Sequence, residues 1–159
     1  MITDQELDKG LLTLKMIWFA MLASLAIYLF VGLQVAPTVR ISMDPNTLSV
    51  LKTILYVVAF VTLFATRYIR KLILSRNGQY TQPAQTSRHP VLQKYSTAMI
   101  VALAMSESIG IYGLVLFLLG KNTMDLYLPL LISAAAMLTY RPRREEVINL
   151  IASKTEPAS

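Results

Sequence analysis

Residues 95–119 read YSTAMIVALAMSESIGIYGLVLFLL, an apolar run in which Glu107 is the only charged residue. A helix needs about 20 apolar residues to cross the hydrocarbon core of a bilayer. Twelve uncharged residues precede Glu107 within the run and twelve follow it. The run therefore predicts a transmembrane helix that carries a carboxyl group near the middle of the bilayer.

Three further apolar segments are candidate spans. Residues 16–35, MIWFAMLASLAIYLFVGLQV, carry no charge, and residues 48–71 form a second candidate whose uncharged part is 53–66. Residues 124–140 form a shorter candidate that contains Pro129. Together with residues 95–119, these segments predict an all-α integral membrane protein with four transmembrane helices.

Lys and Arg are distributed unevenly over the segments that connect the spans. With the N-terminus inside, the inner segments hold 12 of the 15 basic residues, and the outer side holds Arg40, Lys52 and Lys121. Cytoplasmic loops carry an excess of Lys and Arg. The distribution predicts that both termini are cytoplasmic, and we expect a bacterial cytoplasmic (inner) membrane.

The composition narrows the function classes. Apolar residues make up 55% of the 159 residues and charged residues 15%, against about 25% charged in ordinary soluble domains. A soluble chain of this size could not bury so much apolar surface, which disfavours a soluble enzyme or a nucleic-acid binder. The chain has no cysteine and one histidine, His89. We therefore expect no metal, no cofactor and no independent active site.

The four predicted spans pair into two tandem helical hairpins. Their predicted boundaries are 1–75 for the first hairpin (helices about 11–36 and 45–74), 76–90 for a cytoplasmic loop, 91–141 for the second hairpin (helices about 91–119 and 123–141) and 142–159 for a cytoplasmic tail with a short interfacial helix.

An internal repeat is consistent with this arrangement. The segment MLASLAIYLFV at 21–31 aligns without a gap with MSESIGIYGLV at 105–115, and Ala23 then takes the position of Glu107. A duplicated hairpin would explain the match, and so would the few residue types that apolar segments use. The identical positions are Met21, Ser24, Ile27, Tyr28 and Val31 in the first segment, and Met105, Ser108, Ile111, Tyr112 and Val115 in the second.

Glu107 is the residue that most needs an explanation. An acid at mid-bilayer costs about 2.5–3.5 kcal/mol on insertion scales, and desolvation penalises its ionised form. Such a group can bind a proton and release it where its surroundings become polar or cationic. The structural alternative is a protonated glutamate that is hydrogen-bonded to a neighbouring helix.

Small residues recur beside Glu107 at four-residue spacing, which places them on one face of a helix. Close approach of two helix backbones in a membrane uses such residues. The sequence therefore predicts a helix-packing face made of Ala98, Ala102, Ser106 and Gly110, extended by Gly113.

Residues 104–120, AMSESIGIYGLVLFLLG, resemble the carboxylate-bearing helix of the c subunit, or proteolipid, of rotary F- and V-type ATP synthases. That helix typically reads Glu, a small residue, an apolar residue, any residue and then Ile-Tyr-Gly-Leu-Val. Upstream, Arg88-His89-Pro90 resembles the Arg-Gln-Pro cytoplasmic loop of the same family. The residues that match the helix are Glu107, Ser108, Ile111, Tyr112, Gly113, Leu114 and Val115.

By this resemblance, Glu107 would bind and release the transported ion, and Ser108 and Tyr112 match positions that complete the site in sodium-binding members. Ile109 replaces a threonine of those members, so a proton is expected before sodium, which needs several oxygen ligands. The expected assembly is a homo-oligomer or a larger membrane complex in contact with lipid. The alternative is a small four-helix structural or assembly subunit that transports no ion of its own.

Overall fold

The computed structural model describes residues 4–39, 43–75 and 90–155, and every element in these ranges is helical. The loop expected at 76–90 falls outside the described residues, except for Pro90. In chain order the helices are α1 (Asp4–Val35), α2 (Pro45–Ser75), α3 (Pro90–Gly120), α4 (Met124–Thr139) and α5 (Arg144–Thr155).

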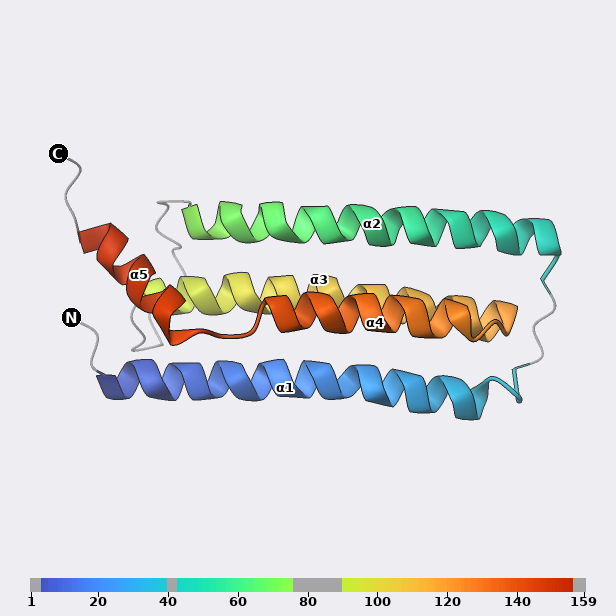
Figure 1. The fold of residues 1–159 in the computed structure, drawn as a ribbon, viewed down its shortest axis with the longest axis horizontal. Helices are drawn as coiled ribbons and strands as arrows, with labels where there is room; N and C mark the ends of the chain where they lie inside the picture. The colour runs from blue at the N-terminus through green and yellow to red at the C-terminus, as the bar shows by residue number, and fades with distance from the viewer. Residues whose placement is uncertain (1–3, 40–42, 76–89, 156–159) are drawn as a thin grey trace.

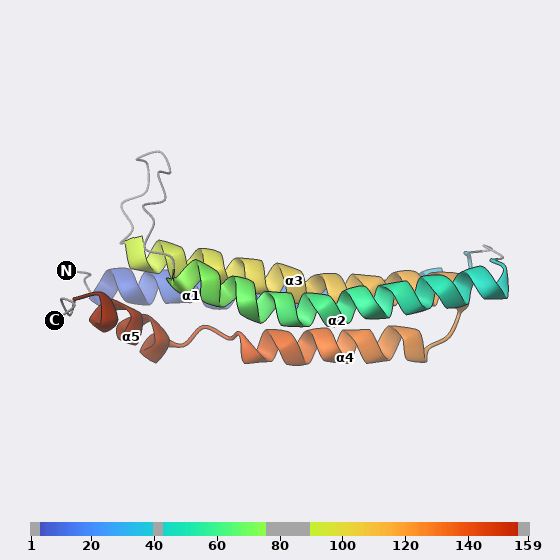
Figure 2. The same cartoon turned by 90° about the horizontal axis from the view of Figure 1, so that it is seen from above.

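Helices α1 to α4 lie side by side along the long axis and alternate in direction (Figures 1 and 2). The start of α1, the end of α2, the start of α3 and the end of α4 therefore lie at one end of the bundle. The short helix α5 lies at this same end, which we call the α5 end. The connections at the opposite end are those between α1 and α2 and between α3 and α4.

Helix α3 occupies the centre of the bundle, since it contacts each of the other four helices. Helix α1 contacts α3 and α4, whereas α2 packs mainly on α3. Figure 1 shows α1 and α2 on opposite sides of the α3–α4 pair. The first two helices of the chain are thus separated in space by the two that follow them.

Three helices, α1, α2 and α3, have apolar segments long enough to cross a membrane, and they indicate a membrane protein. Helix α4 is apolar but has only 16 residues, which corresponds to about 24 Å at the α-helical rise. Large apolar side chains are exposed on the outside of the bundle, such as Phe19 at 69% and Leu131 at 68%. Apolar surface of this kind is suited to contact with lipid tails.

Helix α1 begins at Asp4, earlier than the boundary near residue 11 that its apolar run suggests. Its additional turns are amphipathic: Leu7, Leu11 and Leu14 recur on one face, and all three are buried. The start of α1 is therefore held by packing, which a search for uninterrupted apolar runs does not detect.

Helices α3 and α4 approach closely. A Cβ atom at Gly113 would lie 2.7 Å from Cβ of Pro129 and 3.0 Å from the backbone oxygen of Asp125. Ser133 Oγ of α4 donates a hydrogen bond of 2.6 Å to the backbone oxygen of Ser106. The structure buries every member of the predicted packing face: Ala98, Ala102, Ser106, Gly110 and Gly113.

Replacing Gly113 with Ala tests this contact. The new methyl group would overlap Pro129 and the α4 backbone, which cannot move aside as a flexible side chain can. Overpacking costs about 1–3 kcal/mol, and the better helix propensity of Ala recovers up to about 1 kcal/mol. We expect Gly113→Ala to lower the free energy of unfolding by about 1–2 kcal/mol, measured by thermal or SDS-induced unfolding in detergent.

Gly120→Ala is the matched control, because the nearest atom to its new Cβ would be the flexible tip of Leu48 at 3.2 Å. This variant should stay within about 0.5 kcal/mol of the parent protein. Equal losses in the two variants would show that close packing against α4 is not the reason for glycine at position 113.

Candidate functional site

Glu107 lies in the middle of α3, and its side chain is half-buried. It shares a helix face with Ala104 and Ile111, which are exposed, while the neighbouring Ser106 is buried towards α4. The carboxyl group therefore sits at the edge of the bundle's interior rather than in its core. Helix α1 lies alongside this edge and supplies the polar partners.

Two hydroxyl groups of α1 contact the same carboxyl oxygen of Glu107. Tyr28 OH donates a hydrogen bond of 2.8 Å to Oε1, and Ser24 Oγ is hydrogen-bonded to that oxygen as well. Ser24 and Tyr28 are four residues apart, so both project from one face of α1. The site therefore joins α1 to α3 at the depth of the acid.

The hydrogens of this site can be counted. Ser24 Oγ lies 2.7 Å from the backbone oxygen of Met21, and it also contacts the Glu107 carboxyl group. A hydroxyl group has one hydrogen to donate. Ser24 and Tyr28 thus supply two hydrogens for their contacts with each other, with Met21 and with Glu107. A hydrogen on the Glu107 carboxyl group would have Ser24 Oγ as an acceptor.

Ser108 and Tyr112, the partners implied by the family resemblance, occupy different positions. Ser108 Oγ donates to the backbone oxygen of Met105 at 2.8 Å, within its own helical turn. Within the described ranges, no hydrogen bond joins Ser108 or Tyr112 to Glu107. In an α-helix, the residues one and five positions after Glu107 project from a different side of the helix than Glu107 does.

Sequence patterns do not single out Ser24 and Tyr28 as site residues, although a signal for them is present. In the alignment of 21–31 with 105–115, these two residues take the positions of Ser108 and Tyr112. The hydroxyl groups that contact Glu107 are thus of the same residue types as Ser108 and Tyr112, but they come from α1. Sequence spacing alone cannot show which helix of a repeat faces the acid.

A second polar cluster joins α2 to α4 at the end of the bundle opposite α5. Asp125 lies in the first turn of α4, and its side chain is 8% exposed. Lys52 Nζ lies 2.7 Å from Asp125 Oδ1, and Tyr56 OH donates to the same oxygen over 3.0 Å. Lys52, which the sequence places at the outer end of the second span, neutralises a buried carboxylate there.

A third cluster holds α5 against the bundle. Arg70 of α2 forms an ion pair with Glu146 of α5, and Tyr95 OH of α3 donates to Glu146 over 3.1 Å. The backbone N–H of Arg143 donates to the Tyr95 oxygen over 3.3 Å. Since Val147 is fully buried, α5 packs as part of the protein.

The remaining predicted positions give no additional site. Arg88 lies outside the described residues, and Pro90 is the first residue of α3. Among the residues whose positions are described, no group of three or more His, Asp or Glu side chains is arranged to hold a metal ion. Glu107 with its two hydroxyl partners is the strongest candidate site at mid-helix depth.

Replacing Lys52 with Met tests the buried ion pair with Asp125. Removing one partner of a buried pair leaves an uncompensated charge and costs about 3–5 kcal/mol. Because the Lys52 side chain is 40% exposed, we expect a smaller loss of about 2 kcal/mol in the free energy of unfolding. Denaturation in detergent micelles measures the change.

Adding Asp125→Asn to Lys52→Met should recover part of this loss, because the neutral amide can still accept the Tyr56 hydrogen bond. Lys15→Met, on an exposed part of α1, is the control for loss of a positive charge. A Lys15 variant as destabilised as the Lys52 variant would contradict a specific pair with Asp125.

Comparison of the chain with protein-family models gave no match, and comparisons with curated proteins and with solved structures gave none either. The interpretation of the Glu107 site therefore depends on its geometry and on the sequence patterns described above.

Proposed function

We propose that this chain is a membrane proteolipid in which Glu107 binds and releases a proton as part of an ion-translocating complex. In this proposal the chain crosses the membrane four times and both termini are cytoplasmic. The observation that carries the proposal is the place of the Glu107 carboxyl group, in the middle of an apolar helix and against two hydroxyl groups of α1.

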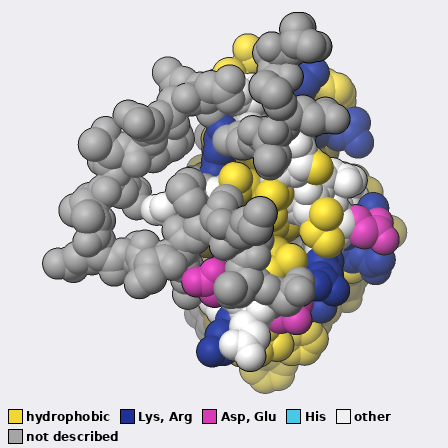
Figure 3. Space-filling view, turned by 90° about the vertical axis from the view of Figure 1, so that its left-hand side faces the viewer, with side chains coloured by type: hydrophobic (Ala, Val, Ile, Leu, Met, Phe, Trp, Pro, Cys, Tyr) yellow, Lys and Arg dark blue, Asp and Glu magenta, His cyan; other side chains and the backbone are white. Residues whose placement is uncertain are grey.

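The alternation of the helices supports four crossings. Helix α4 runs antiparallel to α3 and packs along it, so it would cross the membrane with α3 in spite of its length. The ion pair with Lys52 reduces the cost of placing Asp125 at the outer end of α4. Lys and Arg side chains are visible around the α5 end of the bundle (Figure 3), which supports a cytoplasmic position for that end.

The hydroxyl partners of Glu107 support a proton as the ion. A protonated carboxyl group can donate to Ser24 Oγ while it accepts from Tyr28 OH, because a hydroxyl group both donates and accepts hydrogen bonds. The Tyr28 and Glu107 oxygens already lie at hydrogen-bond separation, 2.8 Å. A bound proton requires no rearrangement of these oxygens.

Release of the proton requires a polar or cationic partner. In the described part of the chain no Lys or Arg forms an ion pair with Glu107, so we assign that partner to another subunit. Exposed apolar side chains flank the acid, with Ile27 and Val31 on α1 and Ile111 and Val115 on α3. This face is open for another transmembrane helix to approach Glu107 from the side.

Infrared spectroscopy and carbodiimide labelling together test protonation at Glu107. A protonated carboxyl group has a C=O stretching band that a carboxylate lacks, and hydrophobic carbodiimides react with protonated carboxyl groups in apolar surroundings. At neutral pH we expect the parent protein in lipid to show the band and to be labelled. Glu107→Gln should lose both signals, because its amide has no carboxylic acid C=O band and no carboxyl group to react.

Asp125→Asn is the matched control, since the parent aspartate is paired with Lys52 and should contribute neither signal. Tyr28→Phe should make the Glu107 band shift in frequency, because one hydrogen bond to its carboxyl group is lost. A band and a label that persist in Glu107→Gln would contradict the proposal, as would a parent protein without either signal at neutral pH.

A second candidate function is favoured by one observation. Both hydrogen-bond partners of Glu107 come from the same chain, so the acid could serve only to hold α1 against α3 in a small structural or assembly subunit. In membrane proteins such interhelical hydrogen bonds contribute about 0.6 kcal/mol on average. This candidate predicts that Glu107→Gln, whose amide oxygen still accepts both hydroxyl hydrogens, keeps the complex and its activity intact.

The oligomeric mass distinguishes the two candidates further. Native mass spectrometry in mild detergent with native lipid should give a ring-sized homo-oligomer if the chain is a proteolipid of the rotary type. A monomer or dimer that persists at high protein concentration would contradict a homomeric ring and would favour the structural subunit.

A further inference from the structure

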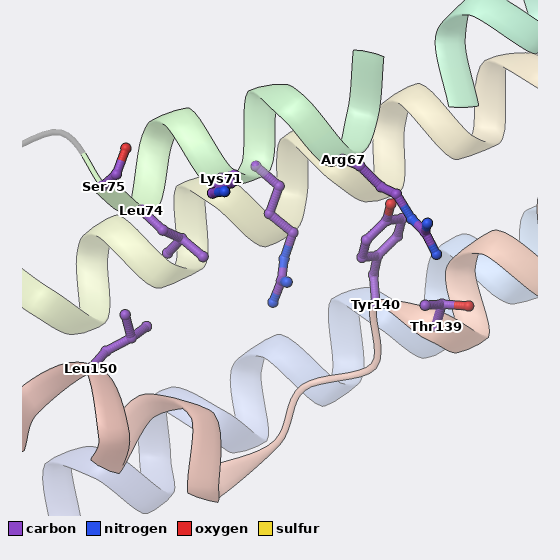
Figure 4. Close-up of a pocket in the computed structure, with 8 residues that line it drawn as sticks. Arg67, Lys71, Leu74, Ser75, Thr139, Tyr140 and Leu150 are labelled. Carbon is purple, nitrogen blue, oxygen red and sulfur yellow. The ribbon is translucent and has the colours of Figure 1, made fainter. Parts of the chain in front are cut away.

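Two cavities between α2 and α4 join end to end. The first, which we call the apolar groove, has a volume of about 460 Å³. The second, which we call the basic pocket, has a volume of about 500 Å³ and lies towards the α5 end (Figure 4). Arg67, Thr139 and Tyr140 line both. Apart from these shared residues, the groove is lined by Phe60, Leu63, Phe64, Ile132, Ala135 and Ala136.

One stripe of α2 forms the wall of both cavities. Phe60, Phe64, Arg67, Lys71 and Leu74 follow one another at intervals of three or four residues, which places them on one face of the helix. The face changes along its length from aromatic to basic. Because the change occurs within one continuous wall, an elongated molecule with an apolar part and an anionic part matches both cavities.

The basic pocket has more positive than negative charge. Arg67, Arg70 and Lys71 line it, and Glu146 pairs with Arg70. Within the described ranges, neither Arg67 nor Lys71 forms an ion pair with a carboxylate. Figure 4 shows Arg67 and Tyr140 facing each other across the gap between α2 and α4, with Leu74 and Leu150 on the side towards α5.

One hydrogen-bond donor of this pocket has no partner in the described residues. The hydroxyl groups of Ser75 and Thr139 also line it, but they already donate to backbone oxygens of their own helices, those of Leu72 and Ala135. The Nε atom of Arg70 is buried and has no hydrogen-bond partner among the described residues. A buried donor without a partner destabilises the protein, so an acceptor in the pocket that reaches this atom would recover part of that loss.

We propose that an anionic phospholipid binds here, with its phosphate in the basic pocket and an acyl chain in the apolar groove. A single negative phosphodiester complements the two unpaired cations, and the groove gives its acyl chain apolar contacts with both helices. The site lies at the bundle end where basic side chains gather, and the anionic lipids of a cytoplasmic leaflet attract such side chains. The inference is independent of the role of Glu107.

Another basic cavity at this end provides a comparison. It lies between α1 and the segment that joins α4 to α5, and its charged lining residues are Lys15, Arg141, Arg143, Arg144 and Glu145. This cavity shares no lining residue with the apolar groove. Its own apolar wall is formed by Met16, Trp18, Phe19 and Ala20 of α1. It therefore offers positive charge beside a different apolar surface and serves as an internal comparison.

Native mass spectrometry of the full-length protein in detergent tests the proposal, with phosphatidylglycerol and phosphatidylcholine supplied in equal amounts. We expect the parent protein to retain phosphatidylglycerol preferentially. The double variant Arg67→Gln/Lys71→Gln should bind it about 30-fold more weakly, from the loss of two basic side chains near the membrane surface. Both residues are exposed, so the fold should tolerate the changes.

The control Lys15→Gln/Arg141→Gln removes the same charge from the comparison cavity and should change phosphatidylglycerol binding less than threefold, on the order of 0.6 kcal/mol. An equal loss in the two double variants would overturn the proposal, because general surface charge would then explain the binding. Equal retention of phosphatidylcholine and phosphatidylglycerol by the parent protein would overturn it too.

The apolar groove is tested separately. Ala135→Phe would fill it and should weaken phosphatidylglycerol binding, whereas Ala23→Phe, at an exposed alanine of α1, should not. Glycerol 3-phosphate and inorganic phosphate supply the charge without an acyl chain and should compete poorly. Strong competition by either, together with unchanged binding in Ala135→Phe, would identify a free-anion site and overturn the assignment to a lipid.

Discussion

The close approach of α3 to α4 is the contact on which the rest of the bundle depends. Lipid tails are as apolar as leucine, so helices in a bilayer associate through close packing and interhelical hydrogen bonds rather than through the hydrophobic effect. Gly113 allows Pro129 to lie against the α3 backbone, and the bond from Ser133 to Ser106 reinforces the contact. Helix α1 packs on both members of this pair, and α2 packs mainly on α3.

Polar contacts then hold the outer helices at different depths, and each joins a different set of helices: α2 with α4, α1 with α3, and α5 with α2 and α3. The contact at mid-depth differs from the other two because its acid is paired with hydroxyl groups instead of a cation. An ion pair fixes the charge of its carboxylate, whereas hydroxyl partners accommodate either protonation state. The three clusters are Lys52–Tyr56–Asp125, Ser24–Tyr28–Glu107 and Arg70–Tyr95–Glu146.

Local sequence patterns predicted the helices well, because apolar run length and four-residue spacing are properties of one segment at a time. They placed Gly113 and its row of small residues on a face that is buried, and Glu107 in the middle of a helix. They did not reveal that Lys52 reaches Asp125 or that Tyr28 reaches Glu107. Such pairs depend on which helices become neighbours, and chain order is a poor guide here because α3 and α4 lie between α1 and α2.

The length of α4 has a consequence for the surrounding bilayer. In a four-span arrangement its 16 residues cover about 24 Å of a hydrocarbon layer about 30 Å thick. Hydrophobic mismatch of this kind is relieved by local thinning of the bilayer or by oligomerisation, and it favours thinner membranes. Because α4 packs against α3 on one flank of the bundle, the strain in the lipid would be one-sided. A second protein that covered α4 would relieve it.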